Sequence, residues 1–164
     1  MQTKIKSVLQ YPMVVYERVE HDISLGRLGG PSRFRPISNL RSSPIGLVTK
    51  KTSGWSLLTH LSYPPGNSVN DCIEEKLTTV QYSKLYNVTY IIQTLGAHII
   101  IGNIHIKSAF RRFTGYPGDF DLLGFEIRDM YYIDKCMPMG CSISCSPFEY
   151  FSTFLQWLFR KYMA

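Results

Sequence analysis

"FDLLGFEIRDMYYIDKC", residues 120–136, is the stretch that decides the fold of this chain. Apolar and aromatic residues fill both halves of the stretch, and the polar pair Arg128-Asp129 separates them. Two β-rich runs joined by a two-residue polar turn are typical of a hairpin, because a tight turn returns the second run beside the first. The stretch therefore predicts two strands about a tight turn at Arg128-Asp129.

A loop and a helix are predicted after this hairpin. "MPMGCSISCSP", residues 137–147, is rich in Gly and Ser, and the aromatic-rich "FEYFSTFLQWLFRKYM" follows at residues 148–163. A helix that is apolar on nearly every side normally packs beneath further structure. We therefore expect the chain to be cut short of the elements that would cover this helix.

Two further helices are predicted upstream. In "YPMVVYERVEHDISLG", residues 11–26, apolar residues recur every four positions, Pro12 stands near the start and Gly26 past the end. In "SKLYNVTYIIQTLG", residues 83–96, apolar residues share one helical face and Gly96 marks the stop.

Strands and connectors occupy the remaining segments. "IGLVTKKTSGWSLLTHL" predicts two short strands, residues 45–50 and 55–60, about a turn at residues 52–54. "AHIIIGNIHI", residues 97–106, is a β-rich run. "GGPSRFRP", residues 29–36, is rich in Gly, Pro and Arg and predicts an extended basic connector.

Composition limits the classes of function. The 164 residues are 45% hydrophobic and suit one globular domain. The formal charge of +6 favours an acidic partner such as nucleic acid. No apolar run is long enough to span a bilayer, so no membrane partner is expected. The cysteines have neither CxxC nor zinc-finger spacing, which favours an intracellular protein, cytoplasmic or nuclear, with no metal knuckle: Cys72, Cys136, Cys141 and Cys145.

Five segments resemble one known family. They are "NLRSSPIGLVTKK", "HLSYPPGNSVND", "IKSAF", "LLGF" and "YYIDKCMPMGCSISC". Together they resemble the reverse transcriptase of DIRS-type retrotransposons, elements that pair this polymerase with a tyrosine recombinase. The resemblance covers nearly the whole chain, and the "KCMPMGCSISC" block at residues 135–145 is its most specific part.

The resemblance implies an α+β right-hand polymerase fold, of which this chain supplies the fingers and the first part of the palm. Residues 1–36 would form an N-terminal helix and basic connector, and residues 37–164 a partial reverse transcriptase domain. The intact family uses Mg²⁺, a template-primer of RNA or DNA, and deoxynucleoside triphosphates. An intact polymerase of the same kind is a further partner to consider.

Nucleotide-binding positions follow from the resemblance. Lys50 and Lys51 at the hairpin tip would neutralise phosphates, Phe110 would stack under the nucleotide sugar, and Met139 and Gly140 would back the templating base pair. The alternatives are lysines that serve solubility, a core aromatic residue and a simple turn. Further nucleic-acid contacts are expected from five arginines: Arg33, Arg35, Arg41, Arg111 and Arg112.

His105 is the main departure from the family pattern. It occupies the strand-end position where the family has a metal-binding aspartate. Imidazole removes a negative charge from a site that must attract two dications, so catalysis should fall by about 10³-fold or more. A changed Zn²⁺ or Mn²⁺ site is disfavoured, because no Cys, His or Asp cluster accompanies the histidine. We therefore predict no bound cofactor in this chain.

Two further departures also argue against polymerase activity. Ser56 stands where the family has a triphosphate-binding arginine, and serine lacks the forked guanidinium donors. The chain ends at Ala164, before the family's second metal-binding hairpin. The other acidic residues considered as substitutes are predicted to be solvated charges: Asp119, Asp121, Glu126, Asp129 and Asp134.

The sequence therefore predicts a catalytically inactive fragment of a DIRS-type RNA-directed DNA polymerase. The hypothesis from another functional class is a non-catalytic nucleic-acid-binding module held to phosphates by lysines and arginines. A third hypothesis is a chain that does not fold stably, because its aromatic helix has no cover.

Overall fold

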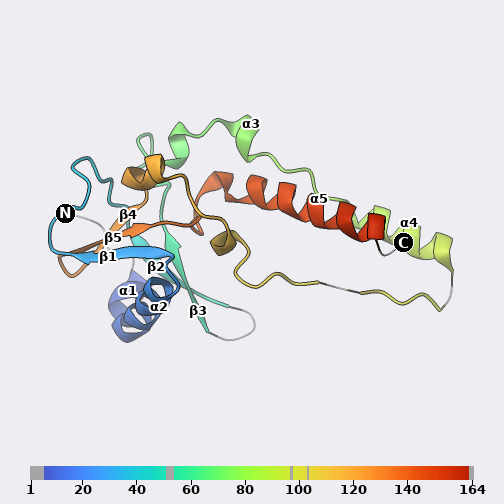
Figure 1. Cartoon of the computed structure of the whole chain (residues 1–164), viewed down its shortest axis with the longest axis horizontal. Coiled ribbons are helices and arrows are strands. Elements are labelled where there is room, and N and C mark those ends of the chain that lie inside the picture. The colour runs from blue at the N-terminus through green and yellow to red at the C-terminus, as the bar shows by residue number, and fades with distance from the viewer. Residues whose placement is uncertain (1–5, 51–53, 97, 103, 163–164) are drawn as a thin grey trace.

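The computed structural model describes residues 6–50, 54–96, 98–102 and 104–162. Two small antiparallel sheets and the first helices form a body at one end of an elongated molecule (Figure 1). The last helix and the segment that carries α4 extend away from this body (Figure 1).

The predicted hairpin at residues 120–136 is confirmed. Strands β4 (Gly124–Ile127) and β5 (Met130–Asp134) pair antiparallel, with Phe125 opposite Tyr132. Arg128 and Asp129 have φ values of 46° and 61°. Positive φ at both turn positions matches the twist of a two-residue hairpin, so these polar residues fix the register of the two strands.

The predicted basic connector at residues 29–36 was wrong in its first half, because Leu28–Ser32 forms strand β1. It pairs antiparallel with β5, and the sheet order is β1-β5-β4. The register shifts between Gly29 and Ser32, where Gly30 and Pro31 interrupt the ladder. Proline is tolerated on an edge strand because its missing N–H faces away from the neighbour, and this Gly/Pro segment therefore forms a strand.

The second predicted hairpin is confirmed. Strands β2 (Ile45–Thr49) and β3 (Trp55–Thr59) form a two-stranded antiparallel sheet. The buried half of β2 lies at its start, and its last residues are exposed. Lys50 therefore lies at the exposed outer end of this hairpin, and the turn residues 51–53 lie outside the described residues.

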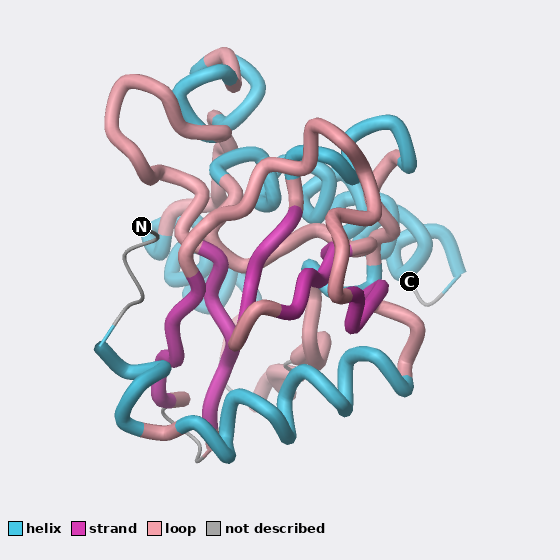
Figure 2. Tube along the Cα trace, turned by 90° about the vertical axis from the view of Figure 1, so that its left-hand side faces the viewer, coloured by secondary structure: helices cyan, strands magenta, loops and turns pink. Residues whose placement is uncertain are grey.

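Helices α1 (Lys6–Gln10) and α2 (Pro12–Ser24) run in a row along one side of the strands (Figure 2). The predicted helix at residues 11–26 is thus confirmed. Its buried residues meet those of both sheets in one core, in which the rings of Phe125 and Tyr132 stack at 5.2 Å. The core consists of Val8, Val15, Val19, Leu28, Ile45, Leu47, Phe125, Ile127 and Tyr132. The predicted boundary after residue 36 stays a prediction.

The connections contain short helical turns. Helix α3 spans Glu75–Thr78. The 3₁₀ turns are η1 (Asn70–Cys72), η2 (Phe110–Arg112), η3 (Pro117–Leu122) and η4 (Ser142–Ser144).

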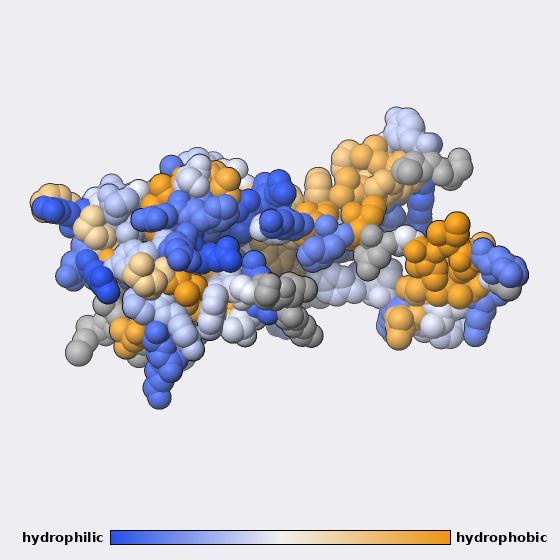
Figure 3. Space-filling view, turned by 90° about the horizontal axis from the view of Figure 1, so that it is seen from below, coloured by the Kyte–Doolittle hydropathy of each residue, from blue (hydrophilic) through white to orange (hydrophobic). Residues whose placement is uncertain are grey.

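Two predicted helices form as expected but lie outside the body. Helix α4 (Leu85–Leu95) ends at Gly96 and buries none of its residues, and α5 (Cys145–Tyr162) also has no buried residue. In the space-filling view two arms with apolar surface extend from the body with space between them (Figure 3).

The predicted strand at residues 97–106 was wrong. Its described residues, 98–102 and 104–106, form no strand, and Ile100 is 99% exposed. A β-rich composition becomes a strand only where a neighbouring strand pairs with it. No such neighbour lies beside this segment among the described elements.

We expect Phe125→Ala to lower the free energy of unfolding by about 3–5 kcal/mol, because it opens a cavity in the core shared by both sheets. Urea unfolding followed by circular dichroism measures this change. Phe34→Ala is the matched control, since Phe34 is 83% exposed and its removal should cost at most about 0.5 kcal/mol. Equal effects of the two substitutions would contradict the location of the core at Phe125.

Candidate nucleotide and nucleic-acid site

Three segments far apart in the sequence meet at the loop that follows β5. The backbone N–H of Thr59, at the end of β3, donates to the carbonyl oxygen of Met139 at 3.0 Å. The N–H of Met137 donates to the carbonyl oxygen of Phe113 at 2.9 Å. The loop therefore lies between the β2–β3 hairpin and the segment that contains η2.

Glycine at position 140 is required by this close approach. Gly140 has a φ of +113°, and a Cβ placed there would overlap the carbonyl oxygen of Thr59. Only glycine combines this φ with so short a separation between backbones. Its neighbour Met139 is 41% exposed, so its side chain is available at the surface of the loop.

Asn70, in the 3₁₀ turn η1, also fixes the loop that follows β5. Its amide nitrogen Nδ2 donates to the carbonyl oxygen of Gly140 at 2.9 Å and to Oγ of Ser62 at 2.8 Å. Its Oδ1 accepts from the backbone N–H of Ser142 at 3.0 Å. One side chain thus bridges the loop on both sides of Cys141. The motif containing Asn70 was part of the sequence resemblance, but the sequence assigned this residue no role.

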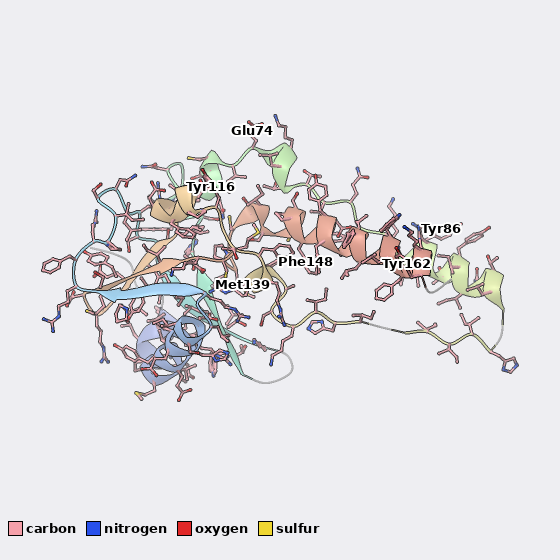
Figure 4. The ribbon with its side chains drawn as sticks, viewed as in Figure 1. Glu74, Tyr86, Tyr116, Met139, Phe148 and Tyr162 are labelled. Atoms are coloured by element: carbon pink, nitrogen blue, oxygen red, sulfur yellow. The ribbon has the colours of Figure 1, made fainter. Side chains whose placement is uncertain are left out.

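Phe110 lies in an aromatic cluster between η2 and the start of α5. Its ring packs edge-on against Phe148 at 6.0 Å, and Phe113 packs against Phe148 at 6.4 Å and Phe151 at 5.6 Å. In the side-chain view Met139 and Phe148 lie where the loop meets α5 (Figure 4). Tyr86 and Tyr162 lie at the opposite end of the molecule (Figure 4). The half-buried Phe110 therefore belongs to the same region as Met139.

Arg111 is held by two carboxylates. Its Nη1 donates to Oδ1 of Asp134 at 2.6 Å, and its Nη2 lies 3.4 Å from Oδ2 of Asp22 in α2. Asp22 also pairs with Arg27 at 3.2 Å. Asp134 additionally accepts from the backbone N–H of Cys136 at 3.0 Å. This network joins α2, η2 and the end of β5.

Burial shifts the pKa of both members of the Arg111–Asp134 ion pair. It raises the pKa of Asp134, and Arg111 opposes that change. Burial also lowers the pKa of Arg111, but the carboxylates of Asp134 and Asp22 more than offset it, so the pKa is raised overall. Arg111 therefore carries its charge inside the protein.

The prediction of a solvated Asp134 was wrong, because its side chain is 6% exposed and paired with Arg111. Asp121 is half-buried and accepts from Nδ2 of Asn39 at 2.6 Å. The remaining acidic residues that the sequence singled out are exposed or half-buried: Asp119, Glu126 and Asp129. A sequence pattern does not reveal a buried pair whose members stand 23 positions apart.

The other predicted phosphate-binding cations differ in exposure. Lys50, Arg33, Arg35 and Arg112 are exposed. Arg41 is half-buried, and its guanidinium donates to the carbonyl oxygen of Asn67. Lys51 lies outside the described residues. The side chains of Arg41 and Arg111 are thus engaged in contacts within the protein.

The donors around His105 do not fit a pair of Mg²⁺ ions. His105 is exposed and lies in the extended segment before η2. Mg²⁺ prefers oxygen ligands, whereas imidazole offers nitrogen. Within the described ranges, no group of three or more His, Cys, Asp or Glu side chains lies close enough together to hold a metal ion.

Comparison with solved structures shows similarity to reverse transcriptases. The selenomethionine-labelled CSH mutant of prototype foamy virus protease-reverse transcriptase matches with a TM-score of 0.63 and 15% identity, over 98% of this chain and 19% of that chain. The native prototype foamy virus protease-reverse transcriptase matches with a TM-score of 0.56 and 17% identity, over 88% of this chain and 17% of that chain. The foamy viral protease-reverse transcriptase dRH in complex with double-stranded DNA matches with a TM-score of 0.60 and 12% identity, over 94% of this chain and 24% of that chain.

These similarities confirm a reverse transcriptase fold for nearly the whole chain, which spans about a fifth of the length of the solved enzymes it matches. The sequence matches no protein-family model and no curated protein. No described helix combines the length and the apolar character needed to cross a membrane.

We expect Arg111→Met to lower the free energy of unfolding by about 3–5 kcal/mol, because it leaves the Asp134 carboxylate buried without a counter-ion. Adding Asp134→Asn should restore at least about 1 kcal/mol, since the buried charge is then gone. Chemical denaturation of the single and double variants measures both changes.

Arg112→Met is the control for this pair, because Arg112 is exposed beside Arg111 and its replacement should cost at most about 0.5 kcal/mol. A neutral Arg111→Met variant would instead support the sequence prediction that Arg111 is free to contact nucleic acid.

Proposed function

We propose that this chain is the fingers and first palm part of a DIRS-type reverse transcriptase, that it binds template-primer nucleic acid, and that it does not itself transfer nucleotides. The DIRS assignment is supported by the motifs, above all "KCMPMGCSISC" at residues 135–145. The fold supports the wider assignment to reverse transcriptases. The structural matches share only 12–17% identity with this chain, so they support the fold and not the narrower DIRS assignment.

One observation carries the proposal. The loop with Met139 and Gly140 is bound both to Thr59 at the base of the β2–β3 hairpin and to Phe113, just after Phe110. These are the elements to which the motifs assign nucleotide contacts. Glycine at position 140 permits the close backbone approach that holds this loop against β3.

Binding is attributed to exposed cations near these elements. Lys50 at the tip of the β2–β3 hairpin, the end opposite the base that contacts the loop, and Arg112 in η2 are exposed. Cations of this kind neutralise backbone phosphates without reading the base sequence. One of the matched enzymes is described in complex with double-stranded DNA. We extend that property to this chain as part of the proposal.

Inactivity is attributed to two positions. At His105 an imidazole replaces the carboxylate that would attract a dication. At Ser56 a hydroxyl replaces the forked guanidinium that would hold a triphosphate. The chain would thus retain the surface that holds nucleic acid and lack groups needed for nucleotidyl transfer.

Binding is tested by fluorescence anisotropy with a labelled RNA–DNA hybrid over a range of salt concentrations. We expect affinity to fall steeply with salt, and Lys50→Gln and Arg112→Gln each to reduce the slope of log K against log salt by about one. Lys76→Gln is the control, because Lys76 in α3 is also exposed but pairs with Glu74. A flat salt response would rule out phosphate binding.

Catalysis is tested by primer extension on an RNA template with Mg²⁺ or Mn²⁺. We expect no extended product from this chain, because a site without the aspartate at position 105 should be slowed by about 10³-fold or more. Extension by the unaltered chain would show that His105 and Ser56 do not abolish catalysis, and the inactive assignment would be withdrawn.

A further inference from the structure

An exposed aromatic residue lies between two arginines directly after β1. Phe34 is 83% exposed, and Arg33 and Arg35 on either side of it are exposed as well. The hydroxyl of Ser32 donates to the carbonyl oxygen of Phe34 at 2.6 Å. This bond holds the turn, so the ring projects from a fixed backbone.

A second aromatic residue and another cation lie beside this turn on the outer face of the β1-β5-β4 sheet. Tyr131 is the register partner of Ser32, and the guanidinium carbon of Arg35 lies 5.9 Å from its ring centroid. A Cβ placed on Gly29 would lie 3.0 Å from Cε of Lys135, so this lysine covers the middle of β1. The outer face thus has the Tyr131 ring of β5 with the cations Arg35 and Lys135 beside it and β1.

The charge of this face is predominantly positive. Arg35 lies near the Tyr131 ring and Lys135 beside Gly29, and the acidic Glu126 is the register partner of Tyr131. Arg33 is a further exposed cation just after β1. The opposite face of the sheet contributes Phe125 and Tyr132 to the core. Phe34 follows the end of β1, is 83% exposed and is not among the residues of that core.

This combination fits unpaired nucleic acid. An aromatic ring stacks on a base face, and neighbouring arginines contact the phosphates on either side of that base. Within a duplex the base faces are already stacked on one another, so an exposed ring has access to them only where a strand is single.

We propose that Phe34, flanked by Arg33 and Arg35, is a stacking site for single-stranded RNA or DNA. This inference rests on the proposed nucleic-acid-binding function and specifies a ligand, an unpaired strand, and a surface distinct from Lys50 and Arg112. The contact is independent of base identity, because every base has a face on which an aromatic ring can stack.

The test uses the full chain and a labelled oligothymidylate of about 12 nucleotides, a length within the usual footprint of single-strand binders. Phe34→Ala should weaken the affinity about tenfold, as expected for the loss of one stacked base, and Phe34→Trp should preserve it. Binding of a blunt RNA–DNA hybrid should change less than about twofold in both variants, since its bases are already stacked.

The outcomes separate this inference from the function on which it rests. If the hybrid binds but the single strand does not, or if Phe34→Ala leaves single-strand affinity unchanged, the stacking site is refuted and the proposed function stands. If Phe34→Ala weakens single strand and hybrid equally, the residue does not select unpaired bases and the inference is overturned. If Phe34→Ala changes only self-association in sedimentation, the patch is a protein contact and the inference is likewise overturned.

Discussion

The ion pair between Arg111 and Asp134 is the interaction on which the geometry of the candidate site depends. Asp134 ends β5, and its carboxylate also accepts the N–H of Cys136, so one side chain fixes both the arginine and the exit of the chain from the sheet. The pair is 16% and 6% exposed. Charges this deeply buried are stable only while each retains its partner.

This pair positions the elements that follow it. With η2 fixed to β5, the carbonyl of Phe113 lies in line with the N–H of Met137, and the loop begins from a defined place. Thr59 at the end of β3 and Asn70 in η1 then hold the loop near Met139 and Gly140. The loop is thus fixed by contacts at both ends, and Gly140 permits the close approach between them.

The two apolar arms, which carry helices α4 and α5, differ from the loop in what stabilises them. An isolated helix of the length of α4, 11 residues, is marginal in water, and most helices in proteins are stabilised by packing of one face. Neither α4 nor α5 buries a residue in the structure described. Exposed apolar surface on this scale marks contact surfaces rather than solvent-facing ones. The body with its two sheets is therefore the packed part of the molecule. Helix α5 joins it at its start, where Phe148 and Phe151 pack against Phe110 and Phe113, and the two arms beyond it present exposed apolar surface.

The sequence alone determined the elements whose signals are local. The hairpin at Arg128-Asp129, the helix that begins at Pro12 and the helix that stops at Gly96 were all predictable, because turn, start and stop residues act within a few positions. The reverse transcriptase resemblance also came from contiguous motifs. The fold comparison supports it at the level of that fold.

Only the tertiary structure decided which segments pair. Leu28–Ser32 became a strand because β5 offered it an edge, while the more β-prone residues around Ile100 had no neighbour and remained extended. The role of Asn70, the burial of Asp134 and the engagement of Arg111 each depend on partners 23 to 89 positions away. Local sequence patterns contain no information on such partners, because a polar side chain has the same propensity whether it later faces water or a buried counter-ion.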